Sequence, residues 1–492
     1  MSFLRSIMFV GTCSDAGKSI VNTAFCRIFK QDGYHPAPFK AQNMSLNSYS
    51  TPDGLEIGRA QAVQAEACGI APESDMNPVL LKPTNEQCSQ VVLNGKPVGN
   101  MSAKEYFVSN NKAELFNQAY AAYERLQARY SPIVLEGAGS ISEINLRERD
   151  ITNMRMALRT NAATYLVADI DRGGVFASVY GSIALLSEEE RKLIKGIIIN
   201  KFRGDISLFD EGRKIIHDLT GIPVVGVIPY FKDIYIEEED SVSLETKNTK
   251  AGSGKINVAI VLLKRLSNFT DFSTLERDER FHAYYTNNVE EIGKADIIIL
   301  PGTKNTISDL RNIRENGIAE AVIRAHKEGK KVIGICGGYQ MMGARIEDPD
   351  QIEGDMTAIP GLGILPLVTT MEPEKVTCQD QFTFCDHPET CKGYEIHMGR
   401  TTLLDGASES PLNRLHDGRT DGYFLNDKCW GTYLHGILDN DVVLNELAEG
   451  LTQATPTLFN YIDFKNQQYD KLADHVRTHV DLPYIYSTLK IK

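Results

Sequence analysis

A cysteine set among glycines offers the clearest chemistry in this chain. Cys336 lies in the run Gly334-Ile335-Cys336-Gly337-Gly338, directly after the short β-like run 331–333. This pattern predicts a buried strand that ends in a sharp turn, because glycines permit backbone angles that other residues avoid. A helix starting after the turn would favour the thiolate. Cys336 is therefore the candidate nucleophile, and a buried cysteine without a catalytic role is the alternative.

A nucleophilic thiol needs a base, and His435 is the candidate. It stands in Gly431-Thr432-Tyr433-Leu434-His435-Gly436, a second short β-like run that delivers a polar residue between glycines. Catalytic cysteine and histidine meet in the fold rather than along the chain, so their separation in sequence is no objection. His397, in the strand-like run 394–397, is interpreted as a binding or structural histidine.

A second chemistry is indicated near residue 10. The apolar residues 7–10 precede Gly11-Thr12-Cys13-Ser14-Asp15-Ala16-Gly17-Lys18-Ser19. After a strand, such a loop can turn its backbone amides toward phosphates, while the lysine reaches the outer phosphates and the serine binds Mg²⁺. The first glycine lies one residue farther from the lysine than the common G-x-x-x-x-G-K-[ST] spacing. The predicted ATP-binding residues of the loop are Gly11, Thr12, Asp15, Gly17, Lys18 and Ser19.

Amide side chains are concentrated between this loop and residue 100. Amides both donate and accept hydrogen bonds, which suits a substrate that carries carboxylates and carboxamides. An ordinary polar loop followed by an amphipathic helix is the alternative. The candidate substrate or phosphate residues are Lys40, Gln42, Asn43, Gln61, Gln64 and Lys82.

The Cys336 and His435 segments resemble the class I glutamine amidotransferases, whose nucleophile sits in a G-x-C-x-G turn. The resemblance implies that Cys336 attacks the glutamine amide and that His435 is its base. It also implies an oxyanion hole built from the backbone N–H groups of Gly302, in the loop 300–305, and Gly337. Most members carry an acid two residues after the histidine, where this chain has Ile437. Either another group orients His435, or the pair works as a dyad.

The spacing of the first loop is similar to that of the deethiobiotin synthetase branch of P-loop enzymes. By this resemblance, Glu136 and Ser19 anchor Mg²⁺, Lys40 contacts the transferred phosphate, and Asn200 reads the purine. Asp53 could complete the metal shell, and a turn-forming role is its alternative. An ATP site of this kind can convert a carboxylate into an acyl phosphate, which ammonia then displaces to give an amide.

Nearly the whole chain resembles the cobyric acid synthase family, through the runs 39–48, 57–67, 77–83, 169–176, 268–272, 393–399 and 433–436. This resemblance implies ATP- and glutamine-dependent amidation of the b, d, e and g carboxylates of adenosylcobyrinic acid a,c-diamide. The cobyrinic acid a,c-diamide synthases share the plan but carry another signature where this chain has residues 40–45. A partitioning-type P-loop ATPase and a catalytically silent scaffold are the alternatives from other classes.

Composition sets the limits of these hypotheses. A chain of 492 residues exceeds what one hydrophobic core usually supports, so two or more domains are expected. A net charge of −13 argues against nucleic-acid binding, which depends on phosphate contacts. No apolar run approaches the roughly 20 residues that span a bilayer. Residues 1–6 lead directly into the first predicted strand, so we expect a cytoplasmic protein, and in that compartment we expect its cysteines to be free thiols. The expected partner is a small corrinoid substrate. A homo-oligomer is compatible with the sequence.

The elements that must position these residues follow from the pattern of the chain. Apolar strands alternate with helical stretches from residue 5 to 229, and a new strand at 256–263 opens a second unit. We expect an α/β protein with two doubly wound parallel-sheet domains and a helical C-terminal tail. The predicted parts are a P-loop synthetase domain at 1–235, a linker at 236–255, a glutamine amidotransferase-like domain at 256–445 and a helical segment at 446–492.

Overall fold

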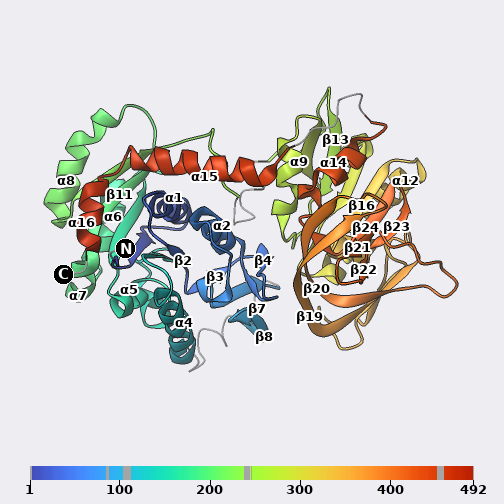
Figure 1. Ribbon diagram of the computed structural model, residues 1–492, viewed down its shortest axis with the longest axis horizontal. Helices are drawn as coiled ribbons and strands as arrows, with labels where there is room; N and C mark the ends of the chain where they lie inside the picture. The colour runs from blue at the N-terminus through green and yellow to red at the C-terminus, as the bar shows by residue number, and fades with distance from the viewer. Residues whose placement is uncertain are drawn as a thin grey trace.

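The computed structural model describes residues 3–84, 88–102, 112–237, 244, 247–451 and 459–490. Two α/β halves lie side by side, and a long helix, α15 (Tyr461–Arg477), extends from one toward the other along the top of Figure 1. Both ends of the described chain lie in the first half. None of the helices in the described segments combines the length and apolarity that crossing a membrane requires.

A six-stranded parallel sheet forms the centre of the first half, in the order β12-β11-β10-β1-β9-β2. Its strands are β1 (Ile7–Gly11), β2 (Ala37–Phe39), β9 (Ile133–Glu136), β10 (Ala163–Asp169), β11 (Ile194–Phe202) and β12 (Val224–Pro229). Phe9 lies opposite Glu136 in the register. Because parallel strands end at one edge of a sheet, the loop after β1 and the carboxylate ending β9 lie at the same edge.

Helices cover both faces of this sheet, with one apolar cluster on each face. They are α1 (Lys18–Gln31), α2 (Arg59–Cys68), α4 (Lys112–Gln127), α5 (Met154–Thr160), α6 (Val175–Ala184), α7 (Glu188–Leu193) and α8 (Asp210–Thr220). This arrangement confirms the doubly wound fold predicted from the alternating pattern.

Two small sheets of the first half were not predicted, and they face the second half (Figure 1). One contains β3 (Gln42–Met44), β6 (Val79–Pro83), β7 (Cys88–Leu93) and β8 (Lys96–Ser102), and the other pairs β4 (Ser48–Ser50) with β5 (Glu56–Gly58). Strand β4 contacts the long strands of the second half. The amide-rich region thus forms the boundary between the halves.

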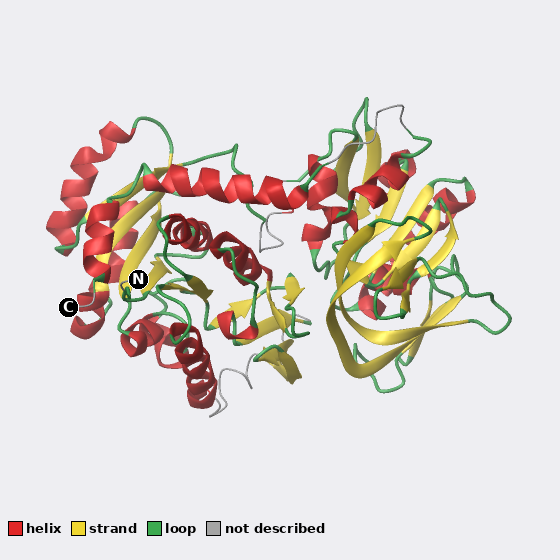
Figure 2. Ribbon diagram, in the orientation of Figure 1, coloured by secondary structure: helices red, strands yellow, loops and turns green. Residues whose placement is uncertain are grey.

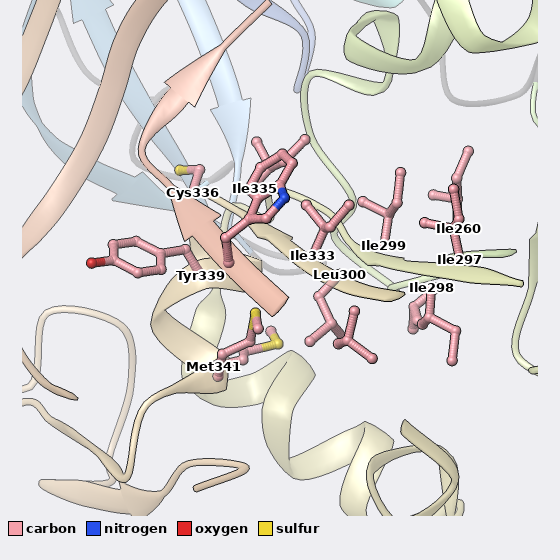
Figure 3. Packing of buried hydrophobic residues seen from close by; sticks show 14 of the residues in the cluster. Ile260, Ile297, Ile298, Ile299, Leu300, Ile333, Ile335, Cys336, Tyr339 and Met341 are labelled. Atoms are coloured by element: carbon pink, nitrogen blue, oxygen red, sulfur yellow. The ribbon is translucent and has the colours of Figure 1, made fainter. Parts of the chain in front are cut away.

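The second half contains another six-stranded sheet, in the order β14-β13-β15-β16-β24-β23, in which only β23 pairs antiparallel. Its strands are β13 (Ile256–Val261), β14 (Phe281–Thr286), β15 (Ile297–Leu300), β16 (Lys331–Ile335), β23 (Tyr423–Asn426) and β24 (Cys429–Thr432). Helices α9 (Ser273–Arg277), α10 (Val289–Lys294), α11 (Thr306–Glu315), α12 (Ile318–Lys327), α13 (Gly337–Met342) and α14 (Asp441–Ala448) accompany it. Figure 3 shows isoleucines of β15 and β16 packed together, with Cys336 at one end of the cluster.

A seven-stranded mixed sheet packs beside this second sheet and is the largest feature that the sequence analysis missed (Figure 2). Its main strands, β19 (Leu367–Phe384) and β20 (Thr390–Leu403), pair antiparallel, with a register shift between Thr370 and Lys375. Strands β17 (Arg345–Glu347), β18 (Ala358–Pro360), β21 (Asn413–Leu415), β22 (Thr420–Asp421) and β25 (Leu434–His435) complete it. Charged residues interrupt the alternation of β19, so the pattern alone does not reveal so long a strand.

The predicted helical C-terminal segment is confirmed, and its helices pack on the first half. Leu472 and Val476 of α15 and Ile485 of α16 (Leu482–Leu489) join the cluster that contains Phe25 and Phe29 of α1. The predicted linker begins with buried Ile236 and Glu237, while residues 238–243 and 245–246 lie outside the described residues. The predicted domain boundaries remain predictions.

Candidate active sites at the edges of the two sheets

Cys336 occupies the sharp turn that its sequence predicts, between β16 and α13. Its backbone angles are φ 51° and ψ −110°, a strained conformation for a residue with a side chain. A Cβ atom on Gly338 would collide with the carbonyl oxygen of Leu300, so the tight turn requires glycine there. Cys336 is 7% exposed, and its Sγ lies 3.7 Å from the carbonyl oxygen of Ile396. The turn holds the thiol at the edge of the sheet.

His435 is buried beside this thiol and is oriented by an acid from another element. Its Nδ1 lies 2.7 Å from Oδ2 of Asp271, whose Oδ1 accepts a hydrogen bond from the Gly436 backbone N–H at 3.0 Å. Burial opposes a charge on His435, but the Asp271 carboxylate and then Cys336 outweigh it and raise its pKa from 6.5 to about 10. The arrangement places a protonated imidazole beside the Cys336 sulfur.

Asp271 is the group that orients His435 in the absence of an acid at position 437, so the site is not a simple Cys–His dyad. Ile437 is fully buried and apolar, whereas Asp271 comes from the short helix η5 (Phe269–Phe272) after β13. Asp271 was not predicted as a site residue, although the run 268–272 that contains it takes part in the family resemblance. A polar residue shortly after a predicted strand was the available signal, but nothing local connects it with His435.

The predicted oxyanion-hole glycines both lie close to this group. A Cβ atom on Gly302 would come within 3.1 Å of Cε1 of His435, and one on Gly337 within 3.2 Å of the Thr303 backbone nitrogen. The loop after β15 thus approaches the cysteine turn, as the resemblance implies. The roles of Gly302 and Gly337 remain predictions.

A small cavity of about 40 Å³ adjoins Cys336 and is lined by residues of both halves. Lys82 of β6 reaches it from the first half, and Lys304, Lys375 and His397 reach it from the second. The His397 ring stacks on Tyr433 with centroids 3.7 Å apart, and its Nε2 lies 3.4 Å from the Glu395 carboxylate. Both the binding and the structural interpretation of His397 fit this position.

The phosphate-type loop lies between β1 and α1, as predicted. Asp15 and Gly17 have positive φ values of 56° and 92°. Lys18 is buried, and its Nζ donates to the carbonyl oxygens of Cys13 at 3.0 Å and Gly139 at 2.9 Å. Asn200, near the carboxyl end of β11, donates its amide to the Ala16 carbonyl at 2.9 Å. The side chains of Lys18 and Asn200 therefore hold the backbone of this loop in its turn.

Three of the predicted residues converge on the buried carboxylate of a fourth, Glu136. Glu136 is 1% exposed; its Oε1 lies 2.8 Å from Ser19 Oγ and 2.9 Å from Lys40 Nζ, and its Oε2 accepts from Gln64 Nε2 at 2.6 Å. Burial alone would raise the pKa of Glu136, but Lys40, with the hydrogen bonds, holds it below its usual value. The cluster is an ionised carboxylate next to the phosphate-type loop.

Two other predicted residues lie away from this cluster. Asp53 occupies the exposed turn between β4 and β5 and accepts a hydrogen bond from Thr51 Oγ1 at 2.5 Å. This position gives no support to its predicted metal role, since the turn packs toward Thr377 of β19. Lys82 lies beside Cys336 rather than beside Lys18, and its Nζ donates to Glu56 at 2.7 Å and to Ser48 at 2.8 Å. Its predicted substrate or phosphate role remains a prediction.

The remaining amides line two different spaces. Asn43 donates to Gln61 Oε1 at 3.0 Å, and both side chains are buried between β3 and α2. Gln42 instead borders a cavity of about 610 Å³ that extends from Gly139 to the basic residues Arg147, Arg149 and Arg155. This cavity adjoins the loop that receives Lys18, so a bound acid there would lie near the predicted phosphate site.

Comparisons with known proteins agree with both halves of the chain. A family described as CobQ/CobB/MinD/ParA nucleotide binding domain matches residues 7–244, and one described as CobB/CobQ-like glutamine amidotransferase domain matches residues 257–443. A solved structure of a glutamine amidotransferase is 18% identical to this chain, covering 39% of this chain and 97% of its own, with a TM-score of 0.31.

Relatives that match this chain over nearly its whole length show the family to which it belongs. The cobyric acid synthase of Parabacteroides distasonis is 71% identical, covering 99% of both chains. That of Bacteroides fragilis is 62% identical, covering 99% of this chain and 98% of its own, and that of Salmonella agona is 46% identical over 99% and 98%. With these identities over its whole length, the chain belongs to the cobyric acid synthase family.

Proposed function

We propose that this protein uses ATP and glutamine to amidate the b, d, e and g carboxylates of adenosylcobyrinic acid a,c-diamide, giving adenosylcobyric acid. Family membership makes it a glutamine-dependent amidating ligase of cobalamin biosynthesis. The observation that carries the proposal is the pairing, in one chain, of the Cys336–His435–Asp271 group with the Glu136 cluster beside a phosphate-type loop. The predicted cytoplasmic location and any self-association remain predictions.

The first reaction releases ammonia from glutamine. The Cys336 thiolate attacks the amide carbon, and the N–H groups of Gly302 and Gly337 stabilise the charge that develops on oxygen. The protonated His435 gives its proton to the departing nitrogen, so a thioester forms and ammonia leaves. Water then hydrolyses the thioester to glutamate, with His435 accepting its proton and Asp271 holding the imidazole throughout.

The second reaction makes the amide. Lys18 and the loop amides hold the nucleotide, and Lys40 neutralises charge where the γ-phosphoryl group passes to the substrate carboxylate. Ammonia attacks the carbonyl carbon of the resulting acyl phosphate, inorganic phosphate leaves, and one proton is released. The arginines around the large cavity suit the remaining carboxylates of a corrinoid.

The residues around Glu136 fit a bound Mg²⁺. Ser19 Oγ and the Glu136 carboxylate are hard oxygen donors of the kind that this ion prefers. The buried Oε1 of Gln64 has no hydrogen-bond partner within the described residues, so the site holds a further oxygen that a hydrated ion would satisfy. When bound, Mg²⁺ neutralises phosphate charge; Ser19 and Glu136 would hold it.

The test is a product assay with two nitrogen sources. The protein is incubated with ATP, Mg²⁺, adenosylcobyrinic acid a,c-diamide and either glutamine or ammonium chloride, and the corrinoids are weighed by mass spectrometry. Stepwise replacement of OH by NH₂ is expected with both. Cys336→Ala should abolish the glutamine reaction and retain the ammonium reaction. Full glutamine-driven activity in that variant would refute the assignment of the nucleophile.

A further inference from the structure

Tyr394 of β20 packs against the base of the Cys336 site. In the antiparallel ladder of β20 and β25, Tyr394 lies directly opposite His435. The two rings stack with their centroids 5.4 Å apart and their planes inclined by 24°. Gly436 follows the histidine with a positive φ of 70°, and a Cβ atom there would lie 3.7 Å from Cε1 of Tyr394. The phenol ring therefore lies against the imidazole and against the backbone of the next residue.

This contact supplies what the Asp271 hydrogen bond to His435 leaves undetermined. A ring held at Nδ1 alone can still turn about that atom and carry its other nitrogen away from Cys336. A second ring packed on its face fixes the plane of the imidazole. An aromatic face also attracts a cation whose centre lies within about 6 Å, so the same contact favours the protonated form of His435. Both the position and the charge of the base depend on Tyr394.

A residue of the first half packs against Tyr394 in turn. The ring centroid of Tyr49 on β4 lies 5.1 Å from that of Tyr394, with the planes inclined by 55°. The guanidinium carbon of Arg59 on α2 lies 4.8 Å from the Tyr49 centroid, and this guanidinium is paired with Glu237. The side chains thus form one series of contacts that crosses from the first half to the second, in the order Arg59, Tyr49, Tyr394 and His435.

The second half holds Tyr49 in place through the residues on either side of it. The Ser48 backbone N–H donates to Asn268 Oδ1 at 3.0 Å. The Ser50 carbonyl oxygen accepts from Gln379 Nε2 at 2.7 Å. Both serines are buried. The docking of the two halves therefore sets the position of the Tyr49 ring.

We propose that Tyr394 is a positioning residue for His435, and that Tyr49 and Arg59 of the first half hold Tyr394 in that position. The inference rests on the proposed function and adds to it a dependence of the glutamine site on a side chain of the other half. Without the Tyr49 ring, Tyr394 is free to turn away from the imidazole. His435 then loses its fixed plane and part of its preference for the proton.

The titratable groups next to the stack are distinguishable by pH. Asp271 and Cys336 face His435 directly, and both are retained in the test. Burial raises the pKa of Asp439, whose carboxylate lies beside Gly436, to about 7, so this group titrates on the acid side of His435. Burial, followed by Asp271, raises the pKa of Tyr394 well above its usual value, so its hydroxyl stays neutral.

The cavity beside Cys336 contributes further charges. Its other ionisable lining residues are Lys82, Lys304, Glu353, Lys375 and His397. Neither Tyr49 nor Tyr394 is among the described residues that line it, so replacing these tyrosines leaves its lining intact. A difference between variants in the alkaline limb of the pH profile therefore reports the proton on His435.

The experiment removes the two rings separately, with Tyr394→Leu and Tyr49→Leu. Tyr394→Phe keeps the ring without its hydroxyl. Tyr180→Leu on α6 is the matched control, because the Tyr180 side chain is 50% exposed. Glutamate release is measured against glutamine concentration, with ATP, Mg²⁺ and adenosylcobyrinic acid a,c-diamide present, across the pH range in which His435 titrates. The ammonium-dependent reaction is measured beside it.

Tyr394→Leu should lower kcat for glutamine about tenfold, with a smaller change in KM, because a misplaced base slows the chemistry more than the binding. The alkaline limb of its kcat profile should move about one pH unit lower. Tyr49→Leu should change both quantities in the same direction by a smaller amount, and Tyr394→Phe should restore most of the rate. Tyr180→Leu should match the wild type, and every variant should retain the ammonium reaction.

A Tyr394→Leu enzyme with the wild-type kcat and an unmoved alkaline limb would overturn the positioning role. So would a Tyr394→Phe enzyme as slow as Tyr394→Leu, because the ring would then not be the part that matters. Unchanged glutamine kinetics in Tyr49→Leu would overturn the contribution of the first half. If Tyr394→Leu loses the ammonium reaction as well, and so fails to fold, the kcat and alkaline limb of Tyr49→Leu decide the proposal by the same criteria.

Alkylation of Cys336 by iodoacetamide separates this inference from the proposed function, because it needs neither ATP nor corrinoid. Followed on the Cys336 peptide by mass spectrometry near neutral pH, it should slow several-fold in Tyr394→Leu and less in Tyr49→Leu, since a displaced imidazolium favours the thiolate less. A wild-type protein that makes no corrinoid amide, with variants that show these rates, would contradict the function and support the stack. An active wild-type protein whose variants are all alkylated equally fast would refute the stack and leave the function standing.

Discussion

The Asp271 carboxylate holds Nδ1 of His435 at 2.7 Å, although the two residues come from opposite ends of the second half of the chain. Asp271 belongs to η5, and the backbone N–H of Phe269 in that helix donates to Asn47 of the first half at 3.1 Å. Asn268 in turn accepts from the Ser48 backbone N–H at 3.0 Å. The element that orients the base is therefore also the element that docks the two halves.

Asp271→Asn should lower glutamine-dependent amidation and leave the ammonium-dependent reaction near the wild-type rate. Loss of the orienting carboxylate misaligns the imidazole and removes the charge that favours its protonated form, which in comparable groups costs about two to four orders of magnitude in rate. Glutamate release measures the effect. Alkylation of Cys336 by iodoacetamide near neutral pH should slow in parallel, and unchanged alkylation with lost turnover would contradict an orienting role.

The stabilising effect of this ion pair should depend on pH in a predictable direction. The pKa of His435 is raised from 6.5 to about 10, so the folded protein binds this proton more tightly than the unfolded chain. The resulting stabilisation is complete below pH 6.5 and is lost as pH rises toward 10. The difference in melting temperature between wild type and Asp271→Asn should be largest near pH 6 and shrink by pH 10. A difference that widens over this range would refute the assignment.

Sequence reasoning found the residues whose chemistry is encoded locally. Cys336 and the loop ending in Lys18 each follow an apolar strand and lie in glycine-rich turns, so the strand–turn pattern alone positions them. Glu136, Ser19 and Lys40 came from separate segments and a resemblance, and they meet because β9, β1 and β2 end at the same edge, whereas Gln64 reaches Glu136 from α2.

What sequence reasoning missed depends on contacts between distant segments. Asp271 has no local signal that connects it with His435, and the antiparallel pairing of β19 with β20 is hidden by the charged residues of β19. Lys82 illustrates the difficulty best: its residue type suits a phosphate, and only the folded chain brings Glu56 and Lys375 to it. A buried ion pair across two domains leaves no periodic pattern in either segment.

Glu136→Gln should eliminate corrinoid-dependent ATP hydrolysis and amidation with either nitrogen source. The Glu136 carboxylate neutralises Lys40 and contacts Ser19. An amide at this position would leave the Lys40 ammonium without its charged partner, and it would also remove the predicted carboxylate ligand of Mg²⁺. The Cys336 group is untouched, so its alkylation rate should remain near the wild-type value. Glu189→Gln on the exposed surface of α7 is the control for loss of one carboxylate. ADP release by Glu136→Gln at the wild-type rate, even at low Mg²⁺, would contradict this role.

Glu237→Gln should destabilise the protein more than any single surface charge, because Glu237 joins three parts of the fold. Its Oε2 accepts from Nε of Arg59 on α2 at 2.8 Å, and its Oε1 accepts from Oη of Tyr461 on α15 at 2.7 Å. Arg59 is only 5% exposed, so the substitution removes the carboxylate that pairs directly with a buried guanidinium. Removing one partner of such a pair costs about 3–5 kcal/mol.

The matched control for this substitution is Arg345→Gln, which breaks the exposed pair of Arg345 with Glu347 and should cost less than about 1 kcal/mol. Urea unfolding followed by intrinsic fluorescence and by circular dichroism compares the two variants with the wild type. The first transition of Glu237→Gln should move to clearly lower urea, because one of the polar links between α15 and α2 is lost, while Glu66 still pairs with Lys465 and the apolar face of α15 still packs against α1. Equal midpoints for the two variants would mean that Glu237 contributes nothing to the docking of the C-terminal helices, which the apolar packing and the other ion pairs of α15 would then maintain.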